Sequence, residues 1–280
     1  MGLSDGALAW GDYDNDGRLD LVVAGLLTAQ GSAATWLYHY DGNDVFSDST
    51  IPLPGLGYSA LAWGDYDNDG RLDLAIAGSS TYQDSGGSGM TRIYRNGAGT
   101  ANTPPAAPGG LAVSEVGRAV TLSWSPASDN ETPAAGLSYN LRVGTAPGAD
   151  DVFTGMADFA SGLRRVPATG NAQKRLSWTL SNLAYSRYYA SVQAIDTAFA
   201  GSPWTVEQAV VVPAATDYDT DGDVDLVDFR HFRDCFNGPN RAPLQAGCSD
   251  ADSDSDNDVD LVDFRTFQDC FNGPNRPPSC

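Results

Sequence analysis

Four short segments of the sequence carry aspartates on alternate residues, a spacing typical of a calcium site. In two of them the pattern is Asp-x-Asp-x-Asp-Gly-x-x-Asp. Calcium takes about six to eight oxygen ligands, and carboxylates on alternate residues converge on one ion only where the backbone bends sharply, which the glycine permits. The residue after the glycine would add its backbone carbonyl. The expected ligands are Asp12, Asp14, Asp16, Arg18 and Asp20 in one loop, and Asp65, Asp67, Asp69, Arg71 and Asp73 in the other.

The other two segments lie near the C-terminus and fill the longer loop pattern of an EF-hand. The first has Gly222 at the sixth position. The second has Asn257 there, and asparagine tolerates the left-handed conformation better than most residues. The N-terminal loops are shorter, because Val23 and Ile76 stand where the last ligand of an EF-hand would be. The expected C-terminal ligands are Asp217, Asp219, Asp221, Asp223, Asp225 and Asp228, and Asp252, Asp254, Asp256, Asp258, Asp260 and Asp263.

These loops hold twenty of the 36 acidic residues of a chain with only 16 basic ones and a formal net charge of −20. That balance argues against nucleic acid or an anionic membrane surface as a partner. For any single loop the alternative is a plain acidic turn that binds no metal. Because the loop recurs four times in two repeated settings, that alternative is the weaker hypothesis. Magnesium fits less well than calcium, because it keeps its waters in preference to an all-protein cage. We therefore expect calcium at about four sites, ordering loops whose carboxylates otherwise repel one another.

Two internal repeats position the loops. Residues 7–25 and 60–78 match at 17 of 19 positions, and a repeat of this spacing is typical of propeller blades or another repeat array. A strand is expected on each side of the loop, with a later strand at 35–38 in the first unit and 91–94 in the second. The first unit also has a predicted fourth strand at 45–49. The second runs into a Pro/Ala linker without one.

The remaining sequence divides into two further parts. Short alternating strands separated by turn residues over residues 109–213 predict a β-sandwich. Residues 223–241 and 258–276 again match at 17 of 19 positions, and each copy reads as an acidic loop followed by one short amphipathic helix. After Asp228, a helical face would carry Phe229, Phe232, Cys235 and Phe236. The expected organisation is two repeat units at 1–100, the last one incomplete, a linker at 101–108, a sandwich at 109–213 and a small α-helical domain at 214–280.

All four cysteines lie in this last part: Cys235, Cys248, Cys270 and Cys280. An even number within one small region suggests two disulfides and an oxidising compartment, and the spacing does not fit a zinc site. No stretch reaches transmembrane length, and the first residues lack the features of a signal peptide. We therefore expect an extracellular or cell-surface location, with this chain as the C-terminal piece of a longer secreted protein or as a mature form.

These motifs resemble three known families. Residues 1–100 resemble the FG-GAP/VCBS blades of integrin-like β-propellers, through the Asp-rich loop and the Leu-Tyr or Ile-Tyr strand that follows it. Residues 104–213 look like a fibronectin type III domain, with Trp124 as the core tryptophan and Leu183 and Tyr188 in the leucine and corner-tyrosine pattern. Residues 217–280 resemble a type I dockerin. The resulting fold class is mainly β and multidomain, with partial propeller blades, a sandwich and a helical dockerin.

The dockerin resemblance implies a cohesin-type protein module as partner. Many dockerins carry a hydroxyl pair at loop positions ten and eleven, where this chain has Leu-Val pairs that either contact another class of cohesin or pack in the core. The partner-binding candidates are Leu226, Val227, Leu261 and Val262. The repeat symmetry favours disulfides Cys235–Cys248 and Cys270–Cys280, and the other two connectivities break that symmetry.

No catalytic constellation is visible in the sequence. The two histidines, His39 and His231, lie near no nucleophile motif, and a glycosidase would need two carboxylates across a cleft that are not committed to metal. The leading hypothesis is a secreted calcium-binding adhesion or anchoring protein, with cell-surface or extracellular polysaccharide as a further candidate ligand. The alternatives are the non-catalytic C-terminal portion of a larger polysaccharide-degrading enzyme, and a calcium-stiffened spacer with no specific partner.

Overall fold

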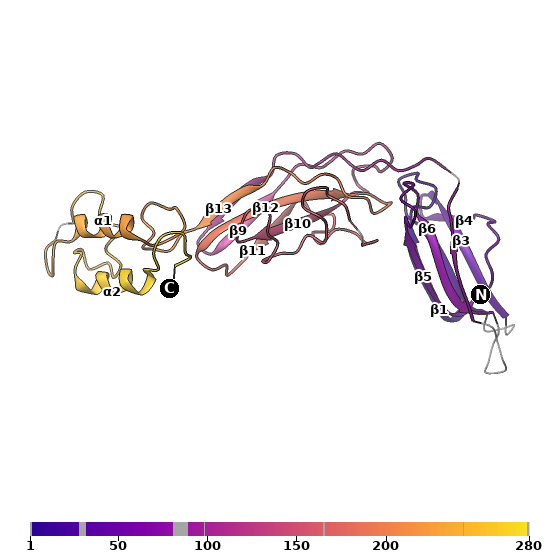
Figure 1. The fold of residues 1–280 in the computed structure, drawn as a ribbon, viewed down its shortest axis with the longest axis horizontal. Coiled ribbons are helices and arrows are strands. Elements are labelled where there is room, and N and C mark those ends of the chain that lie inside the picture. The colour runs from indigo at the N-terminus through magenta and orange to yellow at the C-terminus, as the bar shows by residue number, and fades with distance from the viewer. Residues whose placement is uncertain are drawn as a thin grey trace.

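The computed structural model describes residues 2–27, 32–80, 89–97, 99–164, 166–242, 244–278 and 280. These residues form thirteen strands in four small antiparallel sheets and two helices, so the chain is mainly β, as the sequence predicts. The sheets nearest the N-terminus, the sandwich and the helices follow one another along the molecule (Figure 1). Among the described residues, no helix is both long enough and apolar enough to cross a membrane.

The N-terminal repeat units form two antiparallel sheets in which the acidic loop joins the first two strands. In the first sheet Gly11 pairs with Asp20, and in the second Gly64 pairs with Asp73, so each loop closes the end of a hairpin. The first sheet has the order β1 (Leu3–Gly11), β2 (Asp20–Leu27), β3 (Ser32–Gly42) and β4 (Val45–Asp48). The second has the order β5 (Gly57–Gly64), β6 (Asp73–Ser79) and β7 (Gly89–Tyr94). The predicted fourth strand of the first unit is thus present, and the described part of the second unit has three.

These two sheets pack against each other. Side chains alternate between the faces of a strand, and the face of the second sheet that carries Trp63 covers the face of the first that carries Val22 and Leu37. The contact excludes water from seven apolar side chains: Val22, Leu37, Leu56, Trp63, Leu72, Leu74 and Ile76. Burial of this apolar surface is the main force that holds the pair of hairpins together.

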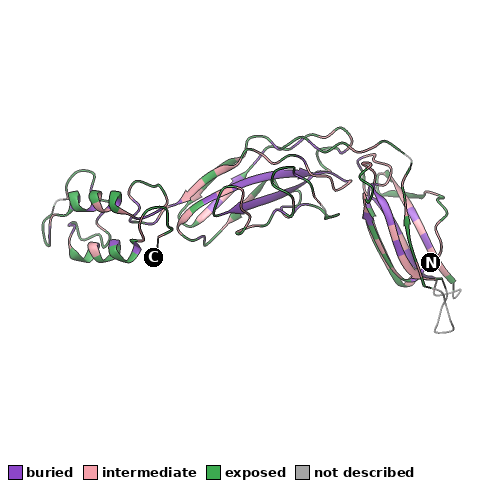
Figure 2. Ribbon diagram, in the orientation of Figure 1, coloured by how far each residue is buried: buried purple, intermediate pink, exposed green. Residues whose placement is uncertain are grey.

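A β-sandwich follows, with its core between two three-stranded sheets. Trp124 and Tyr188 are both almost fully buried in that core, and the Tyr188 hydroxyl donates to the Ala184 carbonyl over 2.9 Å. Buried residues run along the strands of this part (Figure 2). One sheet has the order β11 (Ser177–Leu180), β9 (Ala119–Ser123) and β8 (Ala112–Val116). The other has the order β10 (Ser138–Gly144), β12 (Ser186–Ile195) and β13 (Gln208–Val212).

The C-terminal part contains α1 (Leu226–Cys235) and α2 (Leu261–Cys270). Each helix begins inside its acidic loop, because Asp225 and Asp260 are N-caps in a reciprocal capping box with the residue three positions later. Phe232 and Phe267 are buried between the two halves.

One prediction for this part is wrong, and one open question, the disulfide connectivity, is answered. Phe236, expected on the buried helical face, lies one residue beyond α1 and is 43% exposed. The disulfides are Cys235–Cys248 and Cys270–Cys280, the two pairs that the repeat symmetry favours. Each ties the end of a helix to the segment after it.

Candidate metal centres

The first acidic loop is folded around its first aspartate. Asp12 is 1% exposed, and its carboxylate accepts the backbone N–H groups of Asp16 and Gly17 over 3.0 and 2.8 Å. Gly17 has φ +84°, the left-handed conformation that the sharp bend requires. The last aspartate, Asp20, accepts N–H groups from Tyr13 and from Tyr40 of β3. The loop is therefore held in its bent form by bonds to its own carboxylates.

The carboxylates of this loop converge in a way that suits a cation. Oxygens of Asp12, Asp14 and Asp20 all lie within 4.8 Å of one another, and Oδ1 of Asp14 is buried with no hydrogen-bond partner among the described residues. Burial raises the pKa of Asp12 and of Asp14. Burial, with a smaller contribution from the charge of Asp14, raises the pKa of Asp20 to about 7. A hard divalent ion would offset the cost of bringing these charges together, and the donors are all oxygens, as calcium prefers.

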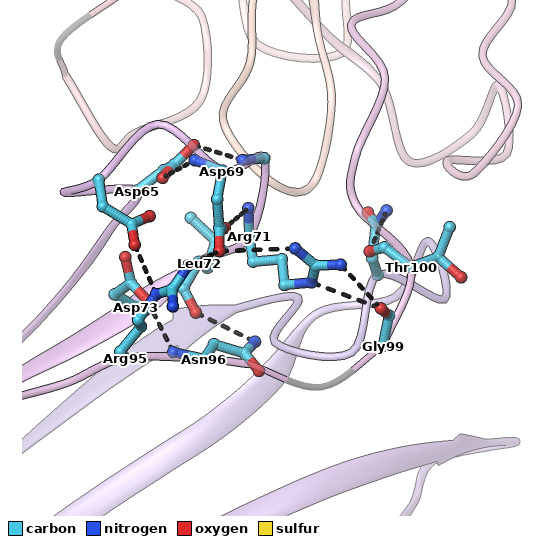
Figure 3. A network of polar contacts seen from close by, with 12 residues as sticks. Asp65, Asp69, Arg71, Leu72, Asp73, Arg95, Asn96, Gly99 and Thr100 are labelled. Atoms are coloured by element: carbon cyan, nitrogen blue, oxygen red, sulfur yellow. Dashed lines mark hydrogen bonds and ion pairs between the residues drawn. The ribbon is translucent and has the colours of Figure 1, made fainter.

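The second loop repeats this arrangement (Figure 3). Asp65 accepts the N–H groups of Asp69 and Gly70 over 3.0 and 2.9 Å. Asp73 accepts the N–H of Tyr66 and, over 2.7 Å, the N–H of Asn96. Oxygens of Asp65, Asp67 and Asp73 again lie within 4.8 Å of one another. Identical sequence therefore gives the same arrangement of carboxylates in both units.

Each N-terminal loop also has a basic neighbour that the sequence analysis did not assign to the site. His39 Nε2 lies 3.1 Å from Asp14 Oδ2, and Arg95 bonds Asp67 and Asp69 over 2.5 and 2.9 Å. Both residues directly follow the tyrosine that ends the Leu-Tyr or Ile-Tyr motif, and this shared position is the signal that could have identified them. Arg95, and His39 when protonated, balance part of the loop charge and share carboxylates with any ion that binds there.

The two arginines predicted as carbonyl ligands lie at the rim of their loops. The Arg18 guanidinium pairs with Asp16, and that of Arg71 lies 3.5 Å from Asp69 and bonds the Gly99 carbonyl. In these contacts the two arginines use only their side chains. Ligation by the backbone carbonyls of Arg18 and Arg71 remains a prediction.

The C-terminal loops use the same bonds for their first aspartate. Asp217 accepts the N–H groups of Asp221 and Gly222, and Asp252 accepts those of Asp256 and Asn257. Asn257 has φ +72°, so it adopts the left-handed conformation of the glycine it replaces. Burial raises the pKa of Asp217 to about 6. The twelfth-position carboxylates, Asp228 and Asp263, close the loops by accepting N–H groups from Tyr218 and Ser253.

Other predicted ligands of these loops have additional partners. Asp223 Oδ2 accepts the N–H of Asn275, and Asp258 Oδ2 accepts that of Asn240, so each reaches from its own loop to the turn after the helix of the other half. In an EF-hand the seventh position supplies its backbone carbonyl, which leaves these side chains available for that contact. The carboxylates of the N-caps Asp225 and Asp260 each accept the N–H two residues later.

The candidate partner-binding pairs lie on the surface. Leu226 and Val227 are 69% and 51% exposed, and Leu261 and Val262 are 70% and 55% exposed. They occupy the first turn of α1 and of α2, directly after the N-caps. Of the two alternatives that the sequence left open, packing in the core is therefore wrong.

Comparison with known proteins supports the N-terminal assignment. The family model described as an FG-GAP-like repeat matches residues 12–76, so the predicted resemblance is confirmed for that segment. No curated protein is significantly similar to the chain. The crystal structure of chicken CNTN1 FN1–FN3 domains, a fibronectin-type β structure, is similar with 12% identity and a TM-score of 0.32, over 70% of this chain and 78% of that one. A likeness of that TM-score carries no functional argument.

Proposed function

We propose that this chain is part of a secreted, calcium-binding adhesion or anchoring protein. The observation that supports calcium is the recurrence of one loop geometry in four places. In each loop the first aspartate accepts the N–H groups four and five residues later. In the loops that begin at Asp12, Asp65 and Asp217, oxygens of three carboxylates lie within 4.8 Å of one another. The ion would be held by the aspartates predicted from the sequence, and it would convert their mutual repulsion into a fixed loop.

We further propose that the N-terminal sheets are consecutive blades of a repeat array of the β-propeller kind. Trp63 is 6% exposed because its face packs on the first sheet, with its indole N–H 3.4 Å from the Ala9 carbonyl. Trp10, the same position of the repeat, is 45% exposed, and Leu8 beside it is 61% exposed. The face of the first sheet that carries Trp10 is therefore exposed, whereas the equivalent face of the second sheet is buried. Another unit of the same repeat is the partner that fits the exposed face.

For the C-terminal part we propose a dockerin that attaches the chain to a cohesin-type module. The exposed Leu-Val pairs support this, because two equivalent apolar pairs on two equivalent helices offer the same surface twice. Exposed apolar side chains that lie next to one another are typical of an interaction site, and each pair is adjacent in the first turn of its helix. The paired disulfides support an extracellular setting for such an attachment.

The test is binding of the full chain to a panel of immobilised cohesin-type modules, with calcium and with EDTA. Replacing one Leu-Val pair by lysines should weaken binding modestly, because the second pair remains. Replacing both pairs should abolish it. Val206→Lys is the matched control, since Val206 is an 82% exposed apolar residue of the sandwich. Binding that survives EDTA, or that ignores the substitution of both pairs, would refute the anchoring role.

A further inference from the structure

The first acidic loop is contacted by a residue from another part of the chain. The turn that follows β12 of the sandwich packs Ala198 and Phe199 against the apolar core of the N-terminal sheets. From the same turn, the Thr197 hydroxyl donates to Asp12 Oδ2 over 2.7 Å. Thr197 is 5% exposed and Asp12 is 1% exposed, so this bond is shielded from water. The sandwich therefore supplies one hydrogen-bond donor to the central carboxylate of the loop.

The direction of this hydrogen bond is fixed by its surroundings. A carboxylate that ligates a metal is ionised and only accepts, so in that state the single hydroxyl proton of Thr197 points to Asp12. Thr132 of the sandwich lies 2.8 Å from the Thr197 oxygen and can donate to it in turn. Two buried hydroxyls are thus aligned toward Asp12. The oxygen they reach, Oδ2, also accepts the Gly17 N–H. The other oxygen, Oδ1, accepts the Asp16 N–H, and its second lone pair can face an ion.

The second loop has no counterpart of this contact. Asp65 accepts the N–H groups of Asp69 and Gly70, and among the described residues no sandwich side chain donates to it. The two loops otherwise share their sequence and their internal bonds. The difference between them is therefore a property of the junction with the sandwich, not of the loop.

We propose that Thr197 is a positioning residue for metal binding at the first loop. This inference rests on the proposed calcium function. A hydrogen-bond donor that orients a metal ligand raises the metal affinity of the site. Loss of such a donor typically lowers that affinity by about 10- to 100-fold. Because coupling between two binding events is reciprocal, calcium at the first loop also strengthens docking of the sandwich on the N-terminal sheets. The first aspartate of the second loop has no such donor among the described residues, so loss of the Thr197 hydroxyl should leave calcium binding there unchanged.

The experiment is a CaCl₂ titration of the ¹⁵N-labelled full chain, followed at the amide signals of Gly17, Gly70 and Gly222. Each of these N–H groups donates to the first aspartate of its own loop, so each reports one site separately. Thr197→Val should raise the calcium midpoint at Gly17 by about tenfold or more and leave the midpoints at Gly70 and Gly222 unchanged. Thr197→Ser, which keeps the hydroxyl, should restore the wild-type midpoint at Gly17.

The outcomes separate this inference from the function on which it rests. An unchanged Gly17 midpoint in Thr197→Val, with calcium bound at both N-terminal loops, would overturn the role of Thr197 and leave the calcium function standing. An equal rise at Gly17 and Gly70 would also overturn it, because the effect would then be a general loss of structure. No calcium response at Gly17 or Gly70 in the wild-type chain would overturn the calcium function of these loops and the inference with it.

Discussion

Replacing Gly17 and Gly70 by alanine, one at a time, probes the junction between the first loop and the sandwich. The two glycines occupy the same repeat position, with φ of +84° and +80°. A Cβ at Gly17 would overlap the Glu131 carbonyl oxygen and lie 2.5 Å from Pro133 Cδ, both in the sandwich. A Cβ at Gly70 would meet its nearest atom, the Asn102 carbonyl oxygen, at 3.2 Å. The variants therefore share their backbone strain and differ in the clash with the sandwich.

The expected magnitudes follow from these contacts. A left-handed alanine costs about 1–2 kcal/mol in each variant. Forcing a methyl group into a packed contact costs a further 1–3 kcal/mol or so, and this cost falls on Gly17→Ala alone. We therefore expect the free energy of unfolding to fall by about 1–2 kcal/mol in Gly70→Ala and by roughly 2–5 kcal/mol in Gly17→Ala. In the latter variant the sandwich should also separate from the first loop.

The assay is urea denaturation followed by tryptophan fluorescence, in EDTA so that altered calcium binding does not contribute. Small-angle X-ray scattering on the same samples measures the separation of the parts. Gly17→Ala should give a larger maximum dimension than the wild-type chain, and Gly70→Ala should not. Equal losses of stability with unchanged scattering in both variants would show that the sandwich does not dock on the first loop, and would refute this reasoning.

Three further predictions concern other parts of the chain. Burial raises the pKa of Asp196, at the same junction, to about 7; the folded state then holds a proton that the unfolded state releases near pH 4, so stability should be greatest below that pH and fall by up to about 4 kcal/mol by pH 7. Denaturation between about pH 5 and pH 8 should show this fall in the wild-type chain and a smaller one in Asp196→Asn, whereas equal falls would contradict it. Removing the Cys235–Cys248 disulfide, whose cysteines are 13 residues apart, by serine substitution should lower the free energy of unfolding by about 3 kcal/mol, and an unchanged urea midpoint would contradict that value. Ala62 precedes Trp63 on β5, so it lies on the opposite face of the second sheet, the face equivalent to the one that Trp63 covers in the first. If the Trp10 face of one chain accepts the Ala62 face of another, Trp10→Asp and Ala62→Asp chains should each be monomeric and form 1:1 pairs when mixed, as measured by analytical ultracentrifugation; association of either variant alone would contradict this contact.

The acidic loops and their flanking strands could be predicted because their determinants are local. A glycine between alternate aspartates permits one bend, and the bonds from Gly17 and Gly70 N–H to the first aspartate follow within five residues. The same holds for the helices, although the Asp225 N-cap places the start of α1 earlier than the hydrophobic pattern indicates. Phe236 does not follow the helical pattern, because α1 ends at the residue before it.

The contacts that connect distant segments could not be predicted in this way. Thr197 lies 185 residues from Asp12, and a threonine in a turn carries no sign of the carboxylate it will meet. His39 lies on β3 and Arg95 directly follows β7, so their contacts with the loops depend on the register of the sheets. The exposure of Trp10 against the burial of Trp63 depends on which unit covers which, and identical sequences do not distinguish the two.

The most direct test of the account is isothermal titration calorimetry of the full chain with calcium, compared with variants in which the first aspartate of one loop is replaced by asparagine. The wild-type chain should bind about four ions, and each substitution should remove one of them: Asp12→Asn, Asp65→Asn, Asp217→Asn and Asp252→Asn. Circular dichroism should show helix lost on addition of EDTA, because α1 and α2 begin inside the acidic loops proposed to bind calcium. Absence of calcium binding, or binding that these substitutions leave unchanged, would contradict the central claim that bent clusters of aspartate oxygens capture the ion.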